Sequence, residues 1–282
     1  MSTSRRDDSS CKRLEEGKAM DDVARPAIQG EVPDSAILSE IKNTEFLAPV
    51  APVAVIPEIP AYLQETYYWA YLNPRNVKLL DREFVVRTIL WQQHKKLAKL
   101  AYVEVEPGQS VMQSACVYGN FSTGLAERVG RGGSLDIFDV AEVQVNNARP
   151  KLEAYPQATV HLGNALHLDN KPFDAVCCFF LLHELPDENK REAVNLFLDK
   201  INPGGKVIFV DYHKPRWWHP LKLITSLVFD TLEPFAKGLW RNEIRELAAS
   251  PEKYNWRKET IFGDLFQKVV ATPKEQRIAA GP

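Results

Sequence analysis

The sequence predicts an α/β fold: a doubly wound, mostly parallel sheet with helices on both faces. Three observations predict it. Short apolar runs alternate with helical stretches through the middle of the chain, as parallel sheets require. The longest apolar run, Ala175–Leu182, spans eight residues and suits a strand buried on both faces. Gly263-Asp264 between two apolar runs indicates a C-terminal antiparallel hairpin.

The expected strands and helices follow one another in the order of β-α-β units. We expect strands at Ser110–Ala115, Ser134–Val140, Ala158–Leu162, Ala175–Leu181 and Lys206–Asp211. Helices are expected between them, at Ser122–Val129, Ala141–Leu152 and Glu188–Lys200. Ligands of such sheets bind outside the carboxyl ends of the strands, so the residues directly after each strand carry the most information.

Two further helical regions flank this core. Asn73 and Pro74 predict a helix start, with an N-cap followed by proline. One face of that helix is expected to carry Val77, Leu80, Phe84, Thr88 and Trp91. An aromatic cluster precedes it, either packing the helix onto the domain or forming a lid over an apolar substrate: Tyr67, Tyr68, Trp69 and Tyr71. After His219, an amphipathic stretch broken by Pro234 predicts a C-terminal helical insertion.

Composition predicts one folded domain between two irregular ends. Residues 1–58 are rich in charged and small polar residues and then in proline, which indicates a disordered tail and an extended linker. The folded domain is expected at residues 59–272 and a disordered C-terminus at 273–282.

Charge and cysteine usage narrow the class of protein. The formal net charge of −2 provides no overall basic field for nucleic acid. The four cysteines form no C-x-x-C pair, which favours free thiols in a reducing compartment. No secretory signal or spanning apolar run is evident, so we expect a soluble cytoplasmic protein, with peripheral contact with the cytoplasmic membrane left open.

The strand ends carry a nucleotide-binding pattern. Residues 115–122 join the first strand to a helix N-terminus through a tight loop, a seat for a nucleotide or a carboxylate. Asp139 follows Gly119 by twenty residues, where an acid binds ribose hydroxyls. Asn164 and Ala165 end the third strand, where the protein can contact the edge of an adenine ring. The predicted cofactor-binding residues are Gln113, Ala115, Val117, Tyr118, Gly119, Asp139, Val140, Asn164 and Ala165.

These features, in this order, resemble the class I S-adenosylmethionine methyltransferase fold over roughly residues 108–271. The alternative is a nicotinamide-type domain, which would require G-x-G-x-x-G, whereas this loop has one glycine. The loop also departs from the methyltransferase pattern of one acid and three glycines, because Gln113, Ala115 and Val117 occupy three of those positions. A β-branched Val117 tolerates positive φ poorly, so the loop must take another path.

The departures match a more specific family. The motifs A-C-V-Y-G at 115–119, F-F-L-L-H-E at 179–184 and V-D-Y-H-K-P at 210–215 resemble the rhodoquinone biosynthesis methyltransferase-like family. So do W-H-P-L at 218–221 and L-E-P-F-A at 232–236. The resemblance covers about residues 66–272. It implies conversion of ubiquinone to rhodoquinone by exchange of a ring methoxy group for an amine, with S-adenosylmethionine as amino donor and manganese as supporting metal.

Two alternatives stay open at this point. One is a conventional S-adenosylmethionine-dependent methyltransferase acting on a quinone or phenol. The other is a non-catalytic partner that binds a quinone or the cofactor. If the amination reading holds, the amine must be neutral to attack a quinone carbon, and a neighbouring carboxylate would hold it as ammonium. The neutral Gln113 leads to the hypothesis that it helps this amine act as a nucleophile.

Polar residues after the fourth and fifth strands are candidates for catalysis and metal binding. His183 and Glu184 follow one strand, and Asp211, Tyr212 and His213 follow the other. Because these strands should be neighbours, we expect the residues to converge on one cleft. Apart from Tyr212, all of them are ligand types that manganese prefers. The plainer interpretation is that His183 and Asp211 satisfy backbone groups or hold the cofactor.

The segment 214–241 combines tryptophan and phenylalanine with lysine and arginine. Aromatic rings with basic flanks suit a helix lying in the headgroup layer of a membrane. The alternative is a helical cover on the active site.

Overall fold

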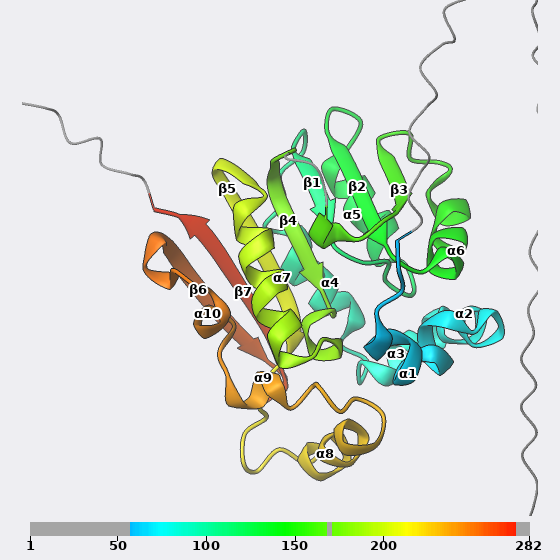
Figure 1. Ribbon diagram of the computed structural model, residues 1–282, viewed down its shortest axis with the longest axis vertical. Coiled ribbons are helices and arrows are strands. Elements are labelled where there is room, and N and C mark those ends of the chain that lie inside the picture. The colour runs from blue at the N-terminus through cyan, green and yellow to red at the C-terminus, as the bar shows by residue number, and fades with distance from the viewer. Residues whose placement is uncertain (1–56, 168–170, 275–282) are drawn as a thin grey trace, which may run out of the picture. The chain divides into compact units, whose positions relative to one another are not determined.

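The computed structural model describes residues 57–167 and 171–274, which contain a seven-stranded sheet of order β3-β2-β1-β4-β5-β7-β6 (Figure 1). Its strands are β1 (Ser110–Gln113), β2 (Ser134–Asp139), β3 (Ala158–Leu162), β4 (Phe173–Phe179), β5 (Ile201–Tyr212), β6 (Tyr254–Ile261) and β7 (Phe266–Pro273). The first five are parallel, and β7 pairs antiparallel with both β5 and β6. The predicted fold class is therefore confirmed. The predicted tail at 1–58 and the predicted C-terminus at 273–282 lie mostly outside the described residues, which leave out 1–56 and 275–282.

The central strands are buried on both faces, which explains their continuous apolar sequences. In β4, six of the seven residues are buried, including Cys177 and Cys178. Between β1 and β4 the strand order reverses, since β2 and β3 lie on one side and β5 on the other. Such a reversal separates the loops that follow the two strands and leaves a crevice at their carboxyl ends.

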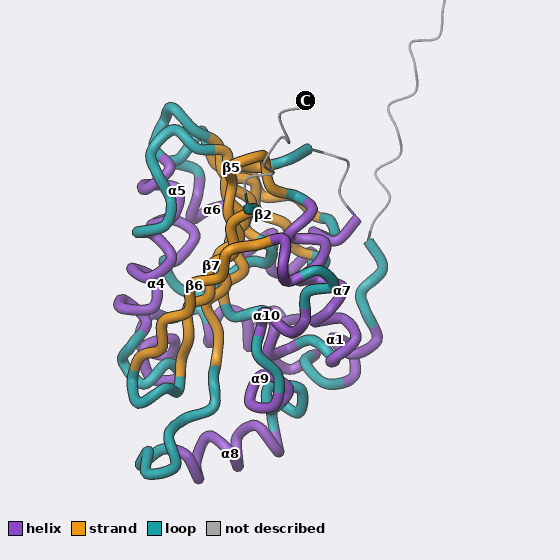
Figure 2. The backbone as a smooth tube through the Cα atoms, turned by 90° about the vertical axis from the view of Figure 1, so that its left-hand side faces the viewer, coloured by secondary structure: helices purple, strands orange, loops and turns teal. Residues whose placement is uncertain are grey.

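Helices cover both faces of the sheet (Figures 1 and 2). One face packs on α4 (His94–Tyr102), α5 (Phe121–Val129) and α6 (Glu142–Leu152), whose buried residues share a core with β1 and β2. The other face packs on α7 (Asp187–Asp199) and α10 (Ile244–Leu247). The three predicted core helices agree with α5, α6 and α7 to within one residue at each end.

The N-terminal region is less regular than expected. It forms α1 (Ala61–Glu65), the π-helix η2 (Tyr68–Leu72), α2 (Pro74–Leu80) and α3 (Glu83–Ile89). Asn73 caps α2 as predicted, because its Oδ1 accepts the backbone N–H of Arg75 at 3.0 Å. The single apolar face running to Trp91 is wrong: the chain turns at Asp81, and the Phe84 side chain is 67% exposed.

The C-terminal third adds the insertion and the hairpin. The insertion contains α8 (Lys222–Thr231) and α9 (Gly238–Arg241), which are separated at Pro234 as expected. Short 3₁₀ turns occur at η3 (Ala165–His167), η4 (Leu182–Glu184) and η5 (Pro251–Lys253). The hairpin turn uses positive φ at Gly263 (+58°) and Asp264 (+65°), residue types that tolerate this conformation.

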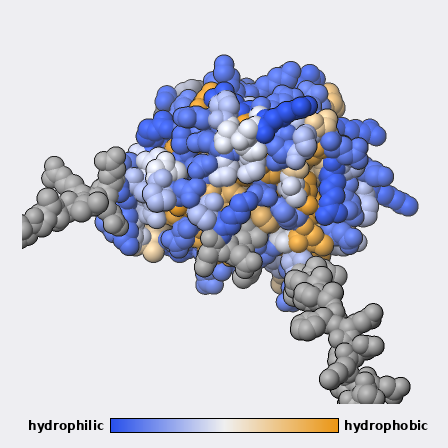
Figure 3. Space-filling model, turned by 90° about the horizontal axis from the view of Figure 1, so that it is seen from above, coloured by the Kyte–Doolittle hydropathy of each residue, from blue (hydrophilic) through white to orange (hydrophobic). Residues whose placement is uncertain are grey.

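Among the described residues, no helix combines the length and the apolar character needed to span a bilayer. The face of the molecule seen from above is largely hydrophilic, with apolar residues gathered in a few places (Figure 3).

Candidate functional site

A cavity of about 780 Å³ lies at the carboxyl ends of the parallel strands. Its walls come from the loops after β1, β2, β3 and β4, and α1, η2 and α3 contribute further residues from the N-terminal region. The aromatic cluster expected either to pack or to act as a lid is divided between the core and the cavity wall. Tyr67 is fully buried, whereas Trp69 and Tyr71 line the cavity.

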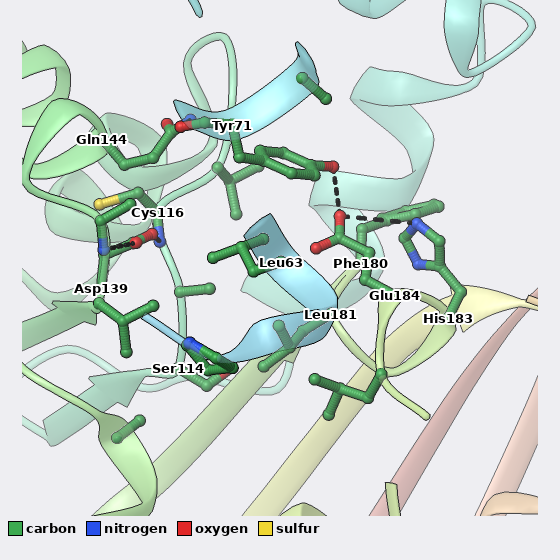
Figure 4. Close-up of a pocket in the computed structure, with 18 of the residues that line it drawn as sticks. Leu63, Tyr71, Ser114, Cys116, Asp139, Gln144, Phe180, Leu181, His183 and Glu184 are labelled. Atoms are coloured by element: carbon green, nitrogen blue, oxygen red, sulfur yellow. Dashed lines mark hydrogen bonds and ion pairs between the residues drawn. The ribbon is translucent and has the colours of Figure 1, made fainter. Parts of the chain in front are cut away.

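Asp139 organises one end of the cavity. Its Oδ2 accepts the backbone N–H of Cys116 at 2.9 Å, and its Oδ1 accepts that of Ala141 at 2.9 Å (Figure 4). Burial raises the pKa of Asp139 to about 6, and these hydrogen bonds oppose that rise. The acid therefore joins the ends of β1 and β2 and also reaches the cavity wall.

The loop after β1 places its one glycine where the backbone has a positive φ. Gly119 has φ +75°, whereas Ala115 and Val117 keep negative φ values in this described loop. A lysine and an acid hold the loop, because Gly119 N–H donates to Asp81 Oδ1 at 2.8 Å and Lys151 Nζ donates to the same oxygen at 2.8 Å. Most predicted cofactor-binding residues line the cavity: Ala115, Val117, Tyr118, Asp139, Val140, Asn164 and Ala165.

Gln113 differs from that expectation. Its side chain is fully buried, and its Nε2 donates to Ala115 O at 2.7 Å and to Ser122 Oγ at 2.9 Å. The amide thus points toward α5, and the residue is not part of the cavity wall. Gln113 stabilises the start of the loop, so the structure gives no support to direct contact between its side chain and a cofactor amine.

A pair of stacked tyrosines forms one wall of the cavity. The rings of Tyr71 and Tyr118 lie 5.7 Å apart at an angle of 13°. Tyr118 Oη donates to Ala70 O at 2.5 Å and accepts from Gln144 Nε2 at 2.8 Å. Gln144 also donates to Tyr71 O at 3.0 Å. Sequence reasoning missed Gln144, because a glutamine within a helix carries no signal of its own.

The opposite end of the cavity holds a buried chain of ionisable groups (Figure 4). His183 Nδ1 lies 2.9 Å from Asp211 Oδ1, and His183 Nε2 lies 3.7 Å from Glu184 Oε1. The Tyr71 hydroxyl group donates a short hydrogen bond to the same Glu184 oxygen. The residues come from η2, η4 and the end of β5, so the sheet and the N-terminal region build this group together.

Burial and charge shift the protonation of this group strongly. Burial alone would lower the pKa of His183, but the charge and hydrogen bond of Asp211 outweigh it and raise the pKa to about 9. Burial raises the pKa of Glu184 to about 8, although the neighbouring His183 opposes this rise. At neutral pH the site therefore presents an imidazolium beside a protonated carboxyl group.

Glu233 and Phe180 are further site residues that the sequence did not single out. Glu233 lies in the connection after α8 and lines the cavity, and burial raises its pKa. Phe180, directly after β4, has φ +52°, which is unusual for a bulky residue and typical of functional sites. Tyr212 lines the same region and packs edge-on against His183 with ring centroids 4.9 Å apart.

The expected convergence of His183, Glu184, Asp211 and His213 on one cleft is wrong for His213. Its Nδ1 faces Asp264 O at 2.8 Å and its Nε2 faces Lys258 Nζ at 2.9 Å, on the hairpin side of β5. His213 lies directly after the end of β5, and its backbone N–H donates to Leu265 O at 2.7 Å, which holds the residue against the hairpin turn. Asp211 is already engaged with His183, and within residues 57–167 and 171–274 no three such side chains are placed to hold a metal ion. The residues therefore do not fit the manganese site expected from the family resemblance.

Comparison with known proteins finds similarity to methyltransferases. Residues 111–205 match a family described as methyltransferase domain. The chain is 27% identical over 177 residues to a demethylmenaquinone methyltransferase of Shouchella clausii, covering 61% of this chain and 71% of that protein. An O-methyltransferase family protein from Burkholderia thailandensis aligns at TM-score 0.56 and 14% identity, covering 71% of this chain and 60% of that one.

A second solved structure is the N-methyltransferase NodS from Bradyrhizobium japonicum in complex with S-adenosyl-L-homocysteine. It aligns at TM-score 0.52 and 15% identity, covering 77% of this chain and all of that one. The chain has the class I methyltransferase fold, and its carboxyl-end cavity lies where that fold places its ligands.

Proposed function

We propose that this protein is an S-adenosylmethionine-dependent transferase that acts on a quinone. The observation that carries the proposal is the continuity of the cavity. One space joins the nucleotide features around Asp139 to the acid–base group around His183. A transferase needs its cofactor and the reacting atom of its substrate in one compartment.

The nucleotide end suits the cofactor. Asp139 presents a carboxylate at the end of β2, where it can accept hydrogen bonds from the two ribose hydroxyl groups. Asn164 and Ala165 follow β3 and line the cavity, and we assign the adenine ring to this part of it. We assign Tyr118 and the loop around Val117 to the methionine part of the cofactor. When bound, the cofactor supplies the group to be transferred.

The acid–base end suits a quinone ring. Phe180, Tyr212 and Tyr71 provide aromatic walls for a flat ring. His183 is an imidazolium at neutral pH and can donate its Nε2 proton to a quinone carbonyl oxygen. That hydrogen bond would stabilise negative charge on the oxygen as a nucleophile adds to the ring. The neutral Glu184 carboxyl group is a second donor in the same place.

The finer proposal is conversion of ubiquinone to rhodoquinone, as the family resemblance implies. In this reaction the amine nitrogen of the cofactor would add to the ring carbon that bears a methoxy group, and the carbon–oxygen bond would break with loss of methanol, which takes a proton from nitrogen. The bond between nitrogen and the cofactor's carbon chain would then break by elimination: nitrogen keeps the electron pair and takes the proton that the neighbouring cofactor carbon loses. The altered loop favours this reaction over ordinary methyl transfer. Ala115 and Val117 fill space that glycines usually leave open, so the cofactor must lie differently.

The test is a reaction of the purified protein with ubiquinone and S-adenosylmethionine labelled with nitrogen-15 at the amine, followed by mass spectrometry. The reaction is run once with manganese and once with EDTA, because the family resemblance implies a metal that the described residues do not readily hold. We expect a quinone that has lost methoxy and gained the labelled nitrogen. The His183→Gln variant should lose product, whereas His161→Gln, a histidine paired with Asp136 outside the cavity, should keep it.

The same experiment distinguishes the alternatives. A quinone that gains only a methyl group, with release of S-adenosylhomocysteine, would identify a conventional methyltransferase. The similarity to demethylmenaquinone methyltransferases favours this second candidate. Cofactor binding without turnover on any quinone would identify a non-catalytic binding partner and overturn both reactions.

A further inference from the structure

We propose that the outer face of α8, with the turn before it, is a docking surface for an anionic lipid bilayer. This docking surface is defined by exposed large apolar side chains: Trp217, Trp218, Leu223, Ile224 and Leu227. The inference extends the proposed function, because it states where an apolar quinone would reach the cavity. Its first test does not depend on activity.

The exposure of these side chains is unusual for a surface helix. Trp217 is 84% exposed, Leu223 82% and Leu227 65%. Leucines at positions i and i+4 lie on one face of a helix, and the inner face of α8 is already used by buried Thr225 and Phe229. A helix that is apolar on its outer as well as its inner face requires a second apolar environment.

The basic residues near the docking surface favour an anionic lipid as its partner. Residues 214–241 contain five Lys or Arg and two Asp or Glu. Three of the basic residues form ion pairs, Arg216 with Asp264, Lys237 with Asp230 and Arg241 with Asp187. Lys214 and Lys222, on either side of Trp217 and Trp218, are the basic residues that we expect to meet a headgroup. One of the two acids, Glu233, lines the cavity instead of the outer surface. Basic residues beside an apolar helix face attract the headgroups of anionic lipids. A second copy of the same surface would bring like charges together, which disfavours a dimer.

The docking surface also adjoins the candidate site. Inward-facing Phe229 packs on Tyr212, a cavity residue, with ring centroids 4.9 Å apart. The connection after α8 brings Glu233 into the cavity wall. Figures 1 and 2 both show α8 at one end of the domain, beyond the carboxyl ends of the parallel strands. A bilayer at this surface would hold an apolar substrate next to the cavity.

Only some of the aromatic residues in the segment 214–241 are exposed. Phe229 is buried, and Trp240 packs against it at 5.4 Å, so these two rings contribute to the core. On the outer face of α8, the exposed apolar side chains are the leucines and the isoleucine. A sequence pattern of aromatic and basic residues could not distinguish the two faces.

The experiment is flotation of the full chain with vesicles of phosphatidylcholine alone or mixed with phosphatidylglycerol. We expect binding to the anionic vesicles that weakens as salt is added. The double variant Leu223→Ser/Leu227→Ser should bind at least about tenfold more weakly, because two apolar side chains no longer enter the bilayer. Val103→Ser is the matched control, since Val103 is 54% exposed at the end of α4, outside the docking surface. Circular dichroism confirms that each variant is folded.

Three results would overturn the proposal: absence of binding to anionic vesicles, equal binding by the double variant, or a dimer in sedimentation that the double variant abolishes. Activity assays separate this proposal from the proposed function. The double variant should keep turnover of a short-tailed quinone in solution and lose turnover of a long-tailed quinone in vesicles. If the protein binds vesicles but turns over neither quinone, the proposed function fails and the docking surface stands.

Discussion

Asp211 holds both the ring and the backbone of His183. Its Oδ1 lies 2.9 Å from His183 Nδ1, and its Oδ2 accepts the backbone N–H of His183 at 3.3 Å. Asp211 ends β5 and His183 follows β4, so this contact locks together two neighbouring strand ends. It leaves Nε2 as the ring nitrogen that faces Glu184. The orientation and the charge of His183 therefore both depend on one buried carboxylate.

The first prediction concerns the effect of Asp211 on the protonation of His183. Asp211→Asn should lower the pKa of His183 below about 9, since the charge and hydrogen bond that raise it are weakened. Proton NMR titration of the histidine resonances, in EDTA, measures this directly. Asp230→Asn, on exposed α8, is the control and should leave the His183 titration unchanged. An unchanged titration in Asp211→Asn would contradict the assignment of Asp211 as the cause.

The contact between His183 and Asp211 also makes the stability of the protein depend on pH. The folded pKa of His183 is above its ordinary value of 6.5, so the pair stabilises the folded state fully below pH 6.5. This stabilisation is lost as the pH rises through about 9. The free energy of unfolding, measured in urea across this range, should fall less steeply for Asp211→Asn than for the unmodified protein.

A second prediction concerns Glu184. Its folded pKa of about 8 lies above its ordinary value of 4.5, so between these values the folded state binds more protons than the unfolded state. Stability should therefore fall as the pH rises through this window. Glu184→Gln keeps an oxygen for the Tyr71 hydroxyl and cannot ionise, so its stability relative to the unmodified protein should rise as the pH increases through this window. Parallel stability curves for the two proteins would show that Glu184 ionises normally.

A third prediction tests the nucleotide end. Asp139→Ala should weaken binding of S-adenosylmethionine by about tenfold or more, because it removes the carboxylate that we assign to the ribose and two hydrogen bonds that hold the chain after β1 and after β2. Isothermal titration calorimetry measures the affinity. Asp136→Ala is the matched control: Asp136 lies on the same strand but pairs with His161 and Lys171 outside the cavity. Equal affinities for the two variants would remove Asp139 from the site.

A fourth prediction concerns a buried lysine that positions the insertion. Lys190 Nζ donates to Leu185 O at 2.7 Å, to Asp187 Oδ1 at 2.8 Å and to Phe235 O at 2.8 Å. Lys190→Met should cost about 2–4 kcal/mol, because it leaves these acceptors without their donor. Urea unfolding measures the loss. Lys95→Met, on the exposed surface of α4, should change stability by less than about 0.5 kcal/mol. A similarly small change in Lys190→Met would show that the insertion is held by other contacts.

The sequence predicted the parts of the fold that local patterns encode. The buried strands, the three core helices and the hairpin at Gly263 follow from apolar periodicity and turn chemistry, which depend on neighbours along the chain. The N-terminal region was predicted less well. Its spacing fits one helix, but the chain turns at Asp81, whose carboxylate binds Gly119 N–H and Lys151 from distant elements. A contact of that kind leaves no periodic signal.

For the site, the sequence by itself determined which residues follow each strand, and hence that Asp139, Asn164 and His183 would face one edge of the sheet. Parallel strands all end at the same edge, so this follows from strand order. Tertiary structure decided the rest. It turned Gln113 and His213 away from the cavity and brought Tyr71 and Glu233 to His183 from segments far apart in the chain. Side-chain direction and long-range packing depend on three-dimensional contacts, which the order of residues does not express directly.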